Sequence, residues 1–117
     1  MRRGEIRFVD LDLDPVRGSE AGNNRPVVVV SNDIANATAR RLGRGVVTVV
    51  PVTSNVDRVY PFQVLLPATA TGLPRESKAQ AEQVRSVAVE RVGKRRGIVP
   101  PQLLRDLDEA LRVHLAL

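Results

Sequence analysis

Polar side chains stand next to two apolar segments of this chain, where a strand would begin or end. Arg25 comes directly before the run Pro26–Val30, and Thr53 and Ser54 follow a second valine-rich run. A guanidinium at a strand end can bind a phosphate through two parallel hydrogen bonds, and it keeps its charge at any working pH. A phosphate site is therefore one interpretation, but taken alone these residues favour the alternatives: a surface ion pair of Arg25 with Glu20, and backbone hydrogen bonds for the hydroxyls.

The cysteine and histidine content of the chain excludes several kinds of catalytic site. The chain has no cysteine and a single histidine, His114, which excludes a cysteine-based zinc site, a thiol nucleophile and a two-histidine acid–base pair. The sequence also has no glycine-rich phosphate loop, no paired-histidine zinc motif and no nucleophile elbow. We therefore expect none of these metal, cofactor or nucleophile sites in this chain. His114 lies beside a leucine stripe and is better explained as a helix-end or interface residue.

The charge balance points to an anionic partner. Sixteen arginines and two lysines outnumber 13 acidic residues, which gives a net charge of +5 at pH 7. A basic surface favours nucleic acid, and the alternative is that the charge serves solubility alone. Arginines outside the predicted strands could track a nucleic-acid backbone, namely Arg2, Arg3, Arg17 and Arg58. Aromatic side chains for base stacking are scarce, because the chain has only Phe8, Tyr60 and Phe62.

The length sets the scale of the protein. At 117 residues and 12.8 kDa the chain fits one small domain, residues 1–117, with one modest core. No apolar run approaches the length required to span a bilayer, and no hydrophobic segment follows the first five residues. We therefore expect a cytoplasmic protein.

The hydropathy pattern predicts mostly short strands. Residues 4–10 alternate with a period of two, which is typical of a half-buried strand. The valine-rich runs 26–30 and 46–50 predict strands that are buried on both faces. Pro51 interrupts the second run, so we expect a bulge or a sheet edge there.

Three further segments complete the predicted sheet. Residues 62–66 and 98–99 predict short strands, whereas 77–89 fits both the helical and the strand period. We favour a strand for 77–89 because β segments surround it. Breaker residues predict polar loops between the strands, at 11–24, 53–61 and 67–76.

Helical patterns appear twice. Residues 33–42 predict a short helix that Gly43 ends. After Pro100 and Pro101, leucines recur at three- and four-residue spacing and predict a carboxy-terminal helix of about four turns. Five to seven short strands with this helix predict a mainly β fold with α structure, a small β-barrel closed by the C-terminal helix.

Several short motifs follow one another in a recognisable order. They are Arg3–Ile6, Val9–Asp12, Gly18–Glu20, Arg25–Asp33, Val50–Asn55, Tyr60–Val64, Glu82–Ser86 and Leu107–Leu111. In this order the chain resembles the MazF/PemK family, the endoribonuclease toxins of bacterial type II toxin–antitoxin modules. The resemblance extends over essentially the whole length.

This resemblance implies an SH3-like barrel of the MazF/Kid type that works as a homodimer, with a cognate acidic antitoxin as partner. It also implies sequence-specific cleavage of single-stranded RNA, chiefly mRNA, without a metal ion. The family's catalytic arginine and threonine correspond to Arg25 and Thr53, and the acid of its Gly-Ser-Glu loop is Glu20. The Kid-like branch instead uses an Arg-x-Asp pair and a loop histidine, where this chain has Gln80, Glu82 and Ser19. The interpretation therefore depends on Arg25 and Thr53.

A chemical scheme follows from the residues that are present. RNA supplies its own nucleophile, the ribose 2′-hydroxyl, and a guanidinium can stabilise the charge that develops on the phosphorane oxygens. The products would be a 2′,3′-cyclic phosphate or a 3′-phosphate, and a 5′-hydroxyl. An arginine is a poor base because its pKa lies above about 12. Glu20 and Glu82 are the candidate bases, and the alternatives are that Glu20 orients Arg25 and that Glu82 pairs with Arg85.

Substrate recognition is expected from polar residues near these positions. Ser19, Asn24 and Ser54 can donate hydrogen bonds to bases or phosphates from the loops, and Gln83 and Arg85 can do so from the sheet. Two other functions stay open: a non-catalytic nucleic-acid-binding β-barrel, and an inactive paralogue that only binds an antitoxin.

Overall fold

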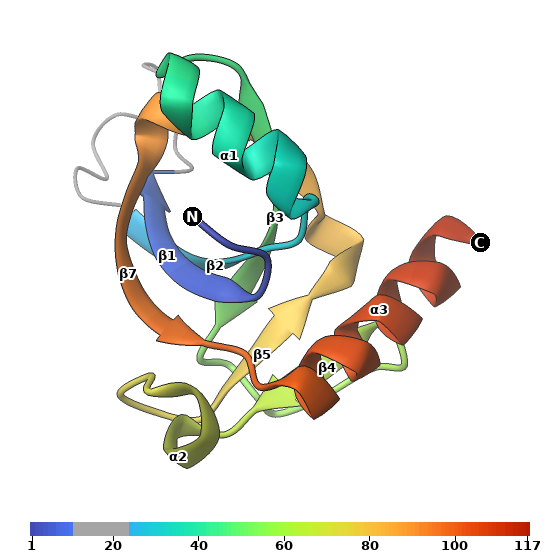
Figure 1. Cartoon of the computed structure of the whole chain (residues 1–117). Coiled ribbons are helices and arrows are strands. Elements are labelled where there is room, and N and C mark those ends of the chain that lie inside the picture. Colours follow the sequence, from blue (N-terminus) through green and yellow to red (C-terminus); the bar gives the residue numbers. More distant parts are fainter. Residues whose placement is uncertain (11–23) are drawn as a thin grey trace, which may run out of the picture.

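The computed structural model describes residues 1–10 and 24–117, and it places seven strands in these residues (Figure 1). The strands are β1 (Glu5–Asp10), β2 (Asn24–Val29), β3 (Val46–Thr53), β4 (Gln63–Leu66), β5 (Ser77–Gln80), β6 (Arg85–Ala88) and β7 (Val92–Ile98). The helices are α1 (Asp33–Leu42), α2 (Ala68–Thr71) and α3 (Pro101–Leu115), with 3-10 turns η2 (Ala81–Gln83) and η3 (Val89–Arg91).

All strand pairs are antiparallel, and their order is β4-β5-β3-β2-β1-β7, with β6 also paired to β3. Figure 1 shows the strongly curved strands with α1 at one end and α3 beside β4. The mainly β class with a carboxy-terminal helix is confirmed. The pairings of the described strands form an open path, so the first and last strands of the expected barrel are not joined by a ladder.

β3 runs through Pro51 without ending. Its first half pairs with β6 as far as Val49, and its second half pairs with β5 from Val52 onward. Pro51 lies between these two partner strands, so its missing N–H breaks neither ladder. The bulge or sheet edge that we expected at Pro51 is therefore wrong: the strand is continuous there and changes its partner from β6 to β5.

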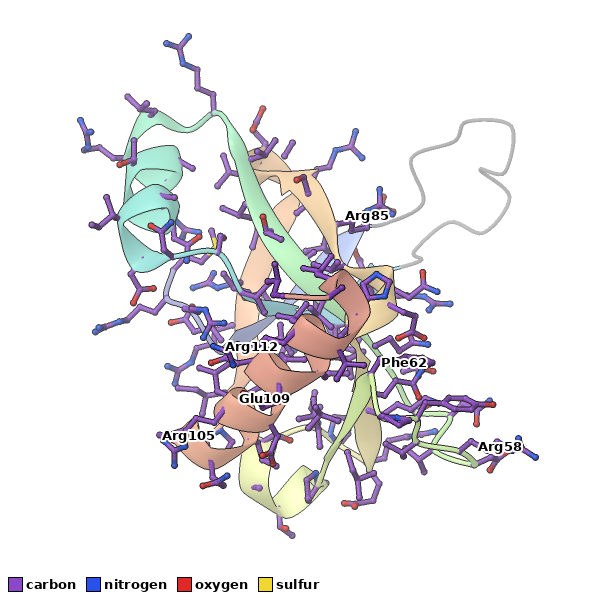
Figure 2. The ribbon with its side chains drawn as sticks, turned by 90° about the vertical axis from the view of Figure 1, so that its right-hand side faces the viewer. Arg58, Phe62, Arg85, Arg105, Glu109 and Arg112 are labelled. Carbon is purple, nitrogen blue, oxygen red and sulfur yellow. The ribbon has the colours of Figure 1, made fainter. Side chains whose placement is uncertain are left out.

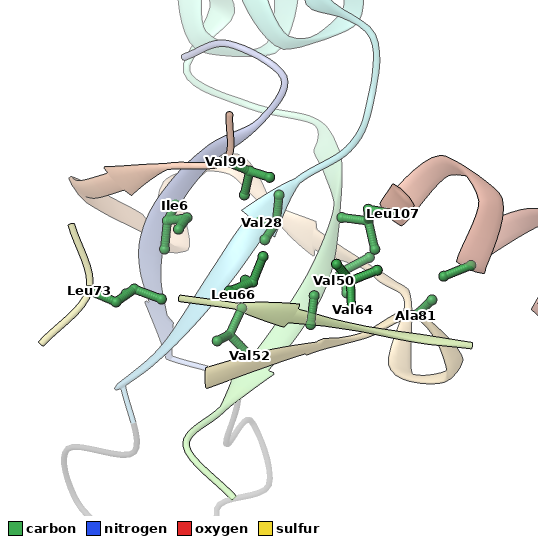
Figure 3. Packing of buried hydrophobic residues seen from close by; sticks show 12 residues of the cluster. Ile6, Val28, Val50, Val52, Val64, Leu66, Leu73, Ala81, Val99 and Leu107 are labelled. Atoms are coloured by element: carbon green, nitrogen blue, oxygen red, sulfur yellow. The ribbon is translucent and has the colours of Figure 1, made fainter. Parts of the chain in front are cut away.

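The core consists of two clusters of buried side chains. The larger one holds Ile6, Val28 and Val50 together with Leu66 and Leu107, and Figure 3 shows these side chains converging between the strands and α3. The smaller one lies on the other face of the sheet and includes Val9, Val27, Val47, Val49 and Val87. Because Ile6 and Val9 belong to different clusters, β1 is buried on both faces and not on one face as predicted.

The two long helices begin and end where the sequence predicts. Asn32 caps α1 by accepting a hydrogen bond from the Ala35 N–H at 2.8 Å, and Gly43 ends the helix in the left-handed region at φ 66°. α3 starts at Pro101 and buries Leu107 and Ala110. Arg3 ties the amino-terminal segment to α3 through an ion pair with Asp108 at 2.5 Å.

Three segments differ from the prediction. The segment 67–76 contains the single-turn helix α2, and 77–89 forms two short strands separated by η2. β7 begins at Val92, six residues before the predicted strand, because its basic residues are tolerated at a sheet edge that faces solvent. None of the helices that the structure describes has both the length and the apolar character needed to cross a membrane.

Candidate active site

A pocket of about 640 Å³ opens at the end of the sheet where β2 begins and β3 ends. Four predicted site residues line it, namely Asn24, Arg25, Thr53 and Ser54. Its apolar lining comes from Phe8, Pro26, Val52, Leu73 and Pro74. The structure therefore brings the predicted catalytic pair into one cavity, together with two of the predicted binding residues.

The pairing of β2 with β3 explains why Arg25 and Thr53 meet. Val27 lies opposite Pro51, and the same register continued by two residues places Arg25 opposite Thr53. Side chains at opposite positions of an antiparallel pair share one face of the sheet and lie within interaction range. Two residues that are 28 positions apart in sequence thus become neighbours through a simple ladder.

The Arg25 guanidinium and the Thr53 hydroxyl differ in how many protein partners they already have. Arg25 is exposed, and none of the ion pairs among the described residues involves it. Thr53 Oγ1 accepts a hydrogen bond from the Asn55 N–H at 3.2 Å, as the backbone alternative predicted, which leaves its hydroxyl proton available for donation. Arg25 therefore presents a charge that no described carboxylate pairs with, beside a hydroxyl donor.

The predicted loop residues Ser19 and Glu20 lie outside the described residues. The ion pair of Arg25 with Glu20 consequently stays a prediction, as does the role of Glu20 as a base. Gln83 and Arg85 are described, and both are exposed, but neither lines the pocket. The sequence placed Arg85 on the sheet correctly, since it starts β6, whereas Gln83 lies in the 3-10 turn η2 and not in a strand.

Glu82, the other candidate base, is also absent from the pocket lining. Its Oε2 accepts a hydrogen bond from Gln63 Nε2 at 2.7 Å, and no described ion pair joins it to Arg85. The Oε1 atom is buried and has no hydrogen-bond partner among the residues described. Glu82 therefore joins η2 to β4, and the predicted pairing of Glu82 with Arg85 is wrong. Its role as a base stays a prediction, away from this pocket.

Two arginines of the pocket were missed by sequence reasoning. Arg75 reaches it from the segment after α2, and Arg96 reaches it from β7. Neither is part of an ion pair among the described residues, and the described lining contains no aspartate or glutamate. Three guanidiniums thus share a cavity without a compensating carboxylate in its described walls, which favours an anionic ligand.

A buried lysine supports the segment that follows Ser54. Lys78 lies opposite Thr53 across the β3–β5 pair, and its Nζ donates a hydrogen bond to the carbonyl oxygen of Arg58 at 2.5 Å. The same ammonium lies 6.0 Å from the ring centre of Tyr60, which stacks on Phe62 with centroids 5.3 Å apart. Figure 2 shows Arg58 projecting outward from this segment.

Glu5 and Arg7 form a nearly buried ion pair on β1. Arg7 Nη2 lies 2.8 Å from Glu5 Oε1, and Arg7 Nη1 also donates to the carbonyl oxygen of Gly93 on β7. Burial acts to raise the pKa of Glu5, but the hydrogen bond and charge of Arg7, with a backbone hydrogen bond from the turn at Arg2, outweigh it and lower the pKa below 4.5. The pair thus joins β1 to β7, the strand that carries Arg96.

The sequence of this chain matches a known family. The family model described as PemK-like, MazF-like toxin of type II toxin–antitoxin system matches residues 2–115, which is nearly the whole chain. The chain belongs to this family. The MazF-like resemblance of the sequence motifs is thereby confirmed.

Individual relatives agree with the assignment of the chain to the MazF-like family. It is 68% identical over 117 residues to endoribonuclease MazF9 of Mycobacterium tuberculosis, covering 100% of this chain and 98% of that protein. It is 32% identical to endoribonuclease EndoA of Bacillus subtilis, over 100% of this chain and 96% of that one. A solved mycobacterial endoribonuclease in complex with its cognate antitoxin has the same fold, with a TM-score of 0.74 at 22% identity, covering 100% and 96% of the two chains.

Proposed function

We propose that this MazF-like protein is the toxin of a type II toxin–antitoxin system and acts as a metal-independent, sequence-specific endoribonuclease on single-stranded RNA. The single observation that carries the proposal is the pocket in which Arg25, which has no ion-pair partner among the described residues, lies beside the hydroxyl of Thr53. The high identity to an endoribonuclease over the full chain supports the same activity. The substrate is mRNA, and its cleavage inhibits translation and growth.

The reaction that suits these groups begins with the ribose 2′-hydroxyl of the substrate. Its oxygen attacks the adjacent phosphorus and loses its proton, while the bond to the 5′-oxygen of the next nucleotide breaks and that oxygen gains a proton. Arg25 stabilises the negative charge that develops on the phosphorane oxygens, and the Thr53 hydroxyl donates a hydrogen bond to the same group. The products are a 2′,3′-cyclic phosphate, or a 3′-phosphate after hydrolysis, and a 5′-hydroxyl.

The remaining roles are assigned from the sequence. Glu20 is our candidate for the group that accepts the 2′-hydroxyl proton. Ser19, Asn24 and Ser54 are the candidate hydrogen-bond donors to RNA near the cleaved bond, and Asn24 and Ser54 line the pocket. Gln83 and Arg85 lie outside this pocket, so they would contact nucleotides of the RNA further from the cleaved bond.

The partners follow from the family. The protein works in the cytoplasm as a homodimer of a single domain, residues 1–117, and an acidic antitoxin inhibits it. A disordered acidic segment that folds on binding suits a basic groove of this kind. The antitoxin complex of the solved mycobacterial relative supports this partner.

The test is RNA cleavage by the purified protein in excess EDTA. Wild-type protein yields defined fragments with 5′-hydroxyl ends, and a DNA oligonucleotide of the same sequence stays intact because it lacks the 2′-hydroxyl. Arg25→Ala lowers the cleavage rate by at least about 10²-fold, with an unchanged melting temperature because Arg25 is exposed. Arg40→Ala, on the exposed side of α1, is the matched control and cleaves like wild type.

Two other results of this assay would support the two alternative functions. Binding of RNA without cleavage would support the non-catalytic barrel, and neither binding nor cleavage would support the inactive paralogue. Cleavage by Arg25→Ala at the wild-type rate would overturn the mechanism.

A further inference from the structure

Arg96 owes its place in the pocket to an irregularity of β7. Ile6 pairs with Gly97, but the next residue of β1, Arg7, pairs with Arg95, so Arg96 is the extra residue of a β-bulge. In a regular ladder Arg96 would lie opposite Arg7. Its side chain would then share a face of the sheet with Arg7, whereas Phe8, the next residue of β1, points to the opposite face. Bulges redirect single side chains in this way and occur next to active sites.

The bulge delivers Arg96 onto an aromatic ring. The guanidinium carbon Cζ lies 4.5 Å from the ring centre of Phe8, which also lines the pocket. A cation–π contact of this kind uses the face of the guanidinium and leaves its in-plane N–H groups available. Those N–H groups have the fork geometry that matches two oxygens of a phosphate.

The charges of the pocket exceed what one phosphate requires. Arg25 lies on β2, Arg96 on β7 and Arg75 in the segment between α2 and β5, and no described carboxylate forms an ion pair with any of them. Like charges gathered in one cavity repel one another until an anion enters. A strand with successive phosphates relieves this repulsion at more than one position.

We propose that Arg96, held by Phe8, binds the phosphate that neighbours the scissile one, with Arg75, which lines the same pocket, contributing to the subsite. This inference rests on the proposed function, which places the scissile phosphate at Arg25 and Thr53. It assigns Arg96 as a substrate-binding residue and Phe8 as a positioning residue. The subsite recognises the backbone and not a base, so it fixes the path of the RNA strand without setting its sequence preference.

The first measurement is the salt dependence of binding. The probe is a short single-stranded oligonucleotide of mixed sequence in which every ribose is 2′-O-methylated, so that it cannot be cleaved. One lost phosphate contact lowers the slope of log K against log salt by about 0.7. We expect this loss in Arg96→Gln and an unchanged slope in Arg95→Gln, which removes the same charge from the adjacent residue of β7 that does not line the pocket.

The second measurement is the kinetics of RNA cleavage. Arg96→Gln raises KM roughly tenfold, the effect of one charge-assisted hydrogen bond, and affects KM more than kcat. Phe8→Leu raises KM in the same direction, whereas Phe8→Tyr keeps the ring and stays near wild type. A purely structural role of Phe8 would lower the melting temperature of Phe8→Leu and leave its KM at the wild-type value.

The two proposals fail in different ways. Equal slopes for Arg96→Gln and wild type, or an equal slope loss in Arg95→Gln, would overturn the subsite. Absence of cleavage by the wild-type protein would overturn the proposed function, and the slopes would still decide on Arg96 because the binding probe requires no chemistry.

Discussion

Gly97 on β7 determines how close α2 lies to the pocket. A Cβ atom at this position would lie 2.3 Å from the backbone carbonyl oxygen of Thr71, whereas ordinary contacts begin near 3.4 Å. The end of α2 would have to retreat by roughly 1 Å in Gly97→Ala. Leu73 resists this shift because it is buried in the larger core cluster two residues further on.

The expected cost of Gly97→Ala is about 1–3 kcal/mol of unfolding free energy, the usual range for overpacking, or a melting temperature lower by about 4–12 °C. Because Arg75 follows α2 and Arg96 precedes Gly97, the same shift widens the pocket and raises KM for RNA cleavage. Gly43→Ala is the control: its Cβ meets no atom within 4 Å, so it costs only the left-handed backbone strain of about 1–2 kcal/mol and leaves KM unchanged. Circular dichroism melts and cleavage kinetics measure both effects, and a Gly97→Ala variant with wild-type melting temperature and KM would refute the reasoning.

Two further predictions concern stability. The lowered pKa of Glu5 means that its carboxylate stabilises the fold above pH 4.5 and that this contribution is lost as the pH falls through the lowered value. Urea unfolding should therefore show a difference between wild type and Glu5→Gln that shrinks in acid; a constant difference would contradict this. Leu107→Ala, at the buried contact of α3 with the core, should cost about 2–5 kcal/mol in the same assay, and a cost below about 1 kcal/mol would show that α3 is not part of the core.

The elements with clear local signals were predictable from the sequence. Asn32 and Gly43 bound α1, Pro101 starts α3, and the valine-rich run after Pro26 forms the buried strand β2. β7 was missed over most of its length because basic residues and two glycines interrupt its hydropathy, and an edge strand needs no apolar alternation. The burial of β1 on both faces was also missed, since it depends on which elements pack beyond each face.

The sequence could predict only those site residues whose positions follow from the pairing of neighbouring strands in a regular register. Arg25 and Thr53 flank two valine-rich strands that pair directly, so their meeting follows from adjacent positions in the ladder. Arg75 and Arg96 reach the same pocket through a single-turn helix and a β-bulge. Neither feature has a sequence signature, because both are fixed by long-range contacts such as that of Gly97 with Thr71.

The change of partner along β3 has a consequence for how the protein opens. One half of this strand is held by β6 and the other by β5, and its side chains enter both hydrophobic clusters. Fraying of β4, β6 or β7 leaves the rest of the sheet in place, whereas separating β2 from β3 divides both clusters at once. We therefore expect the backbone amides in the middle of β3 to exchange with solvent only when the whole molecule unfolds. The strand that carries Thr53 should then show the slowest amide hydrogen exchange in the protein.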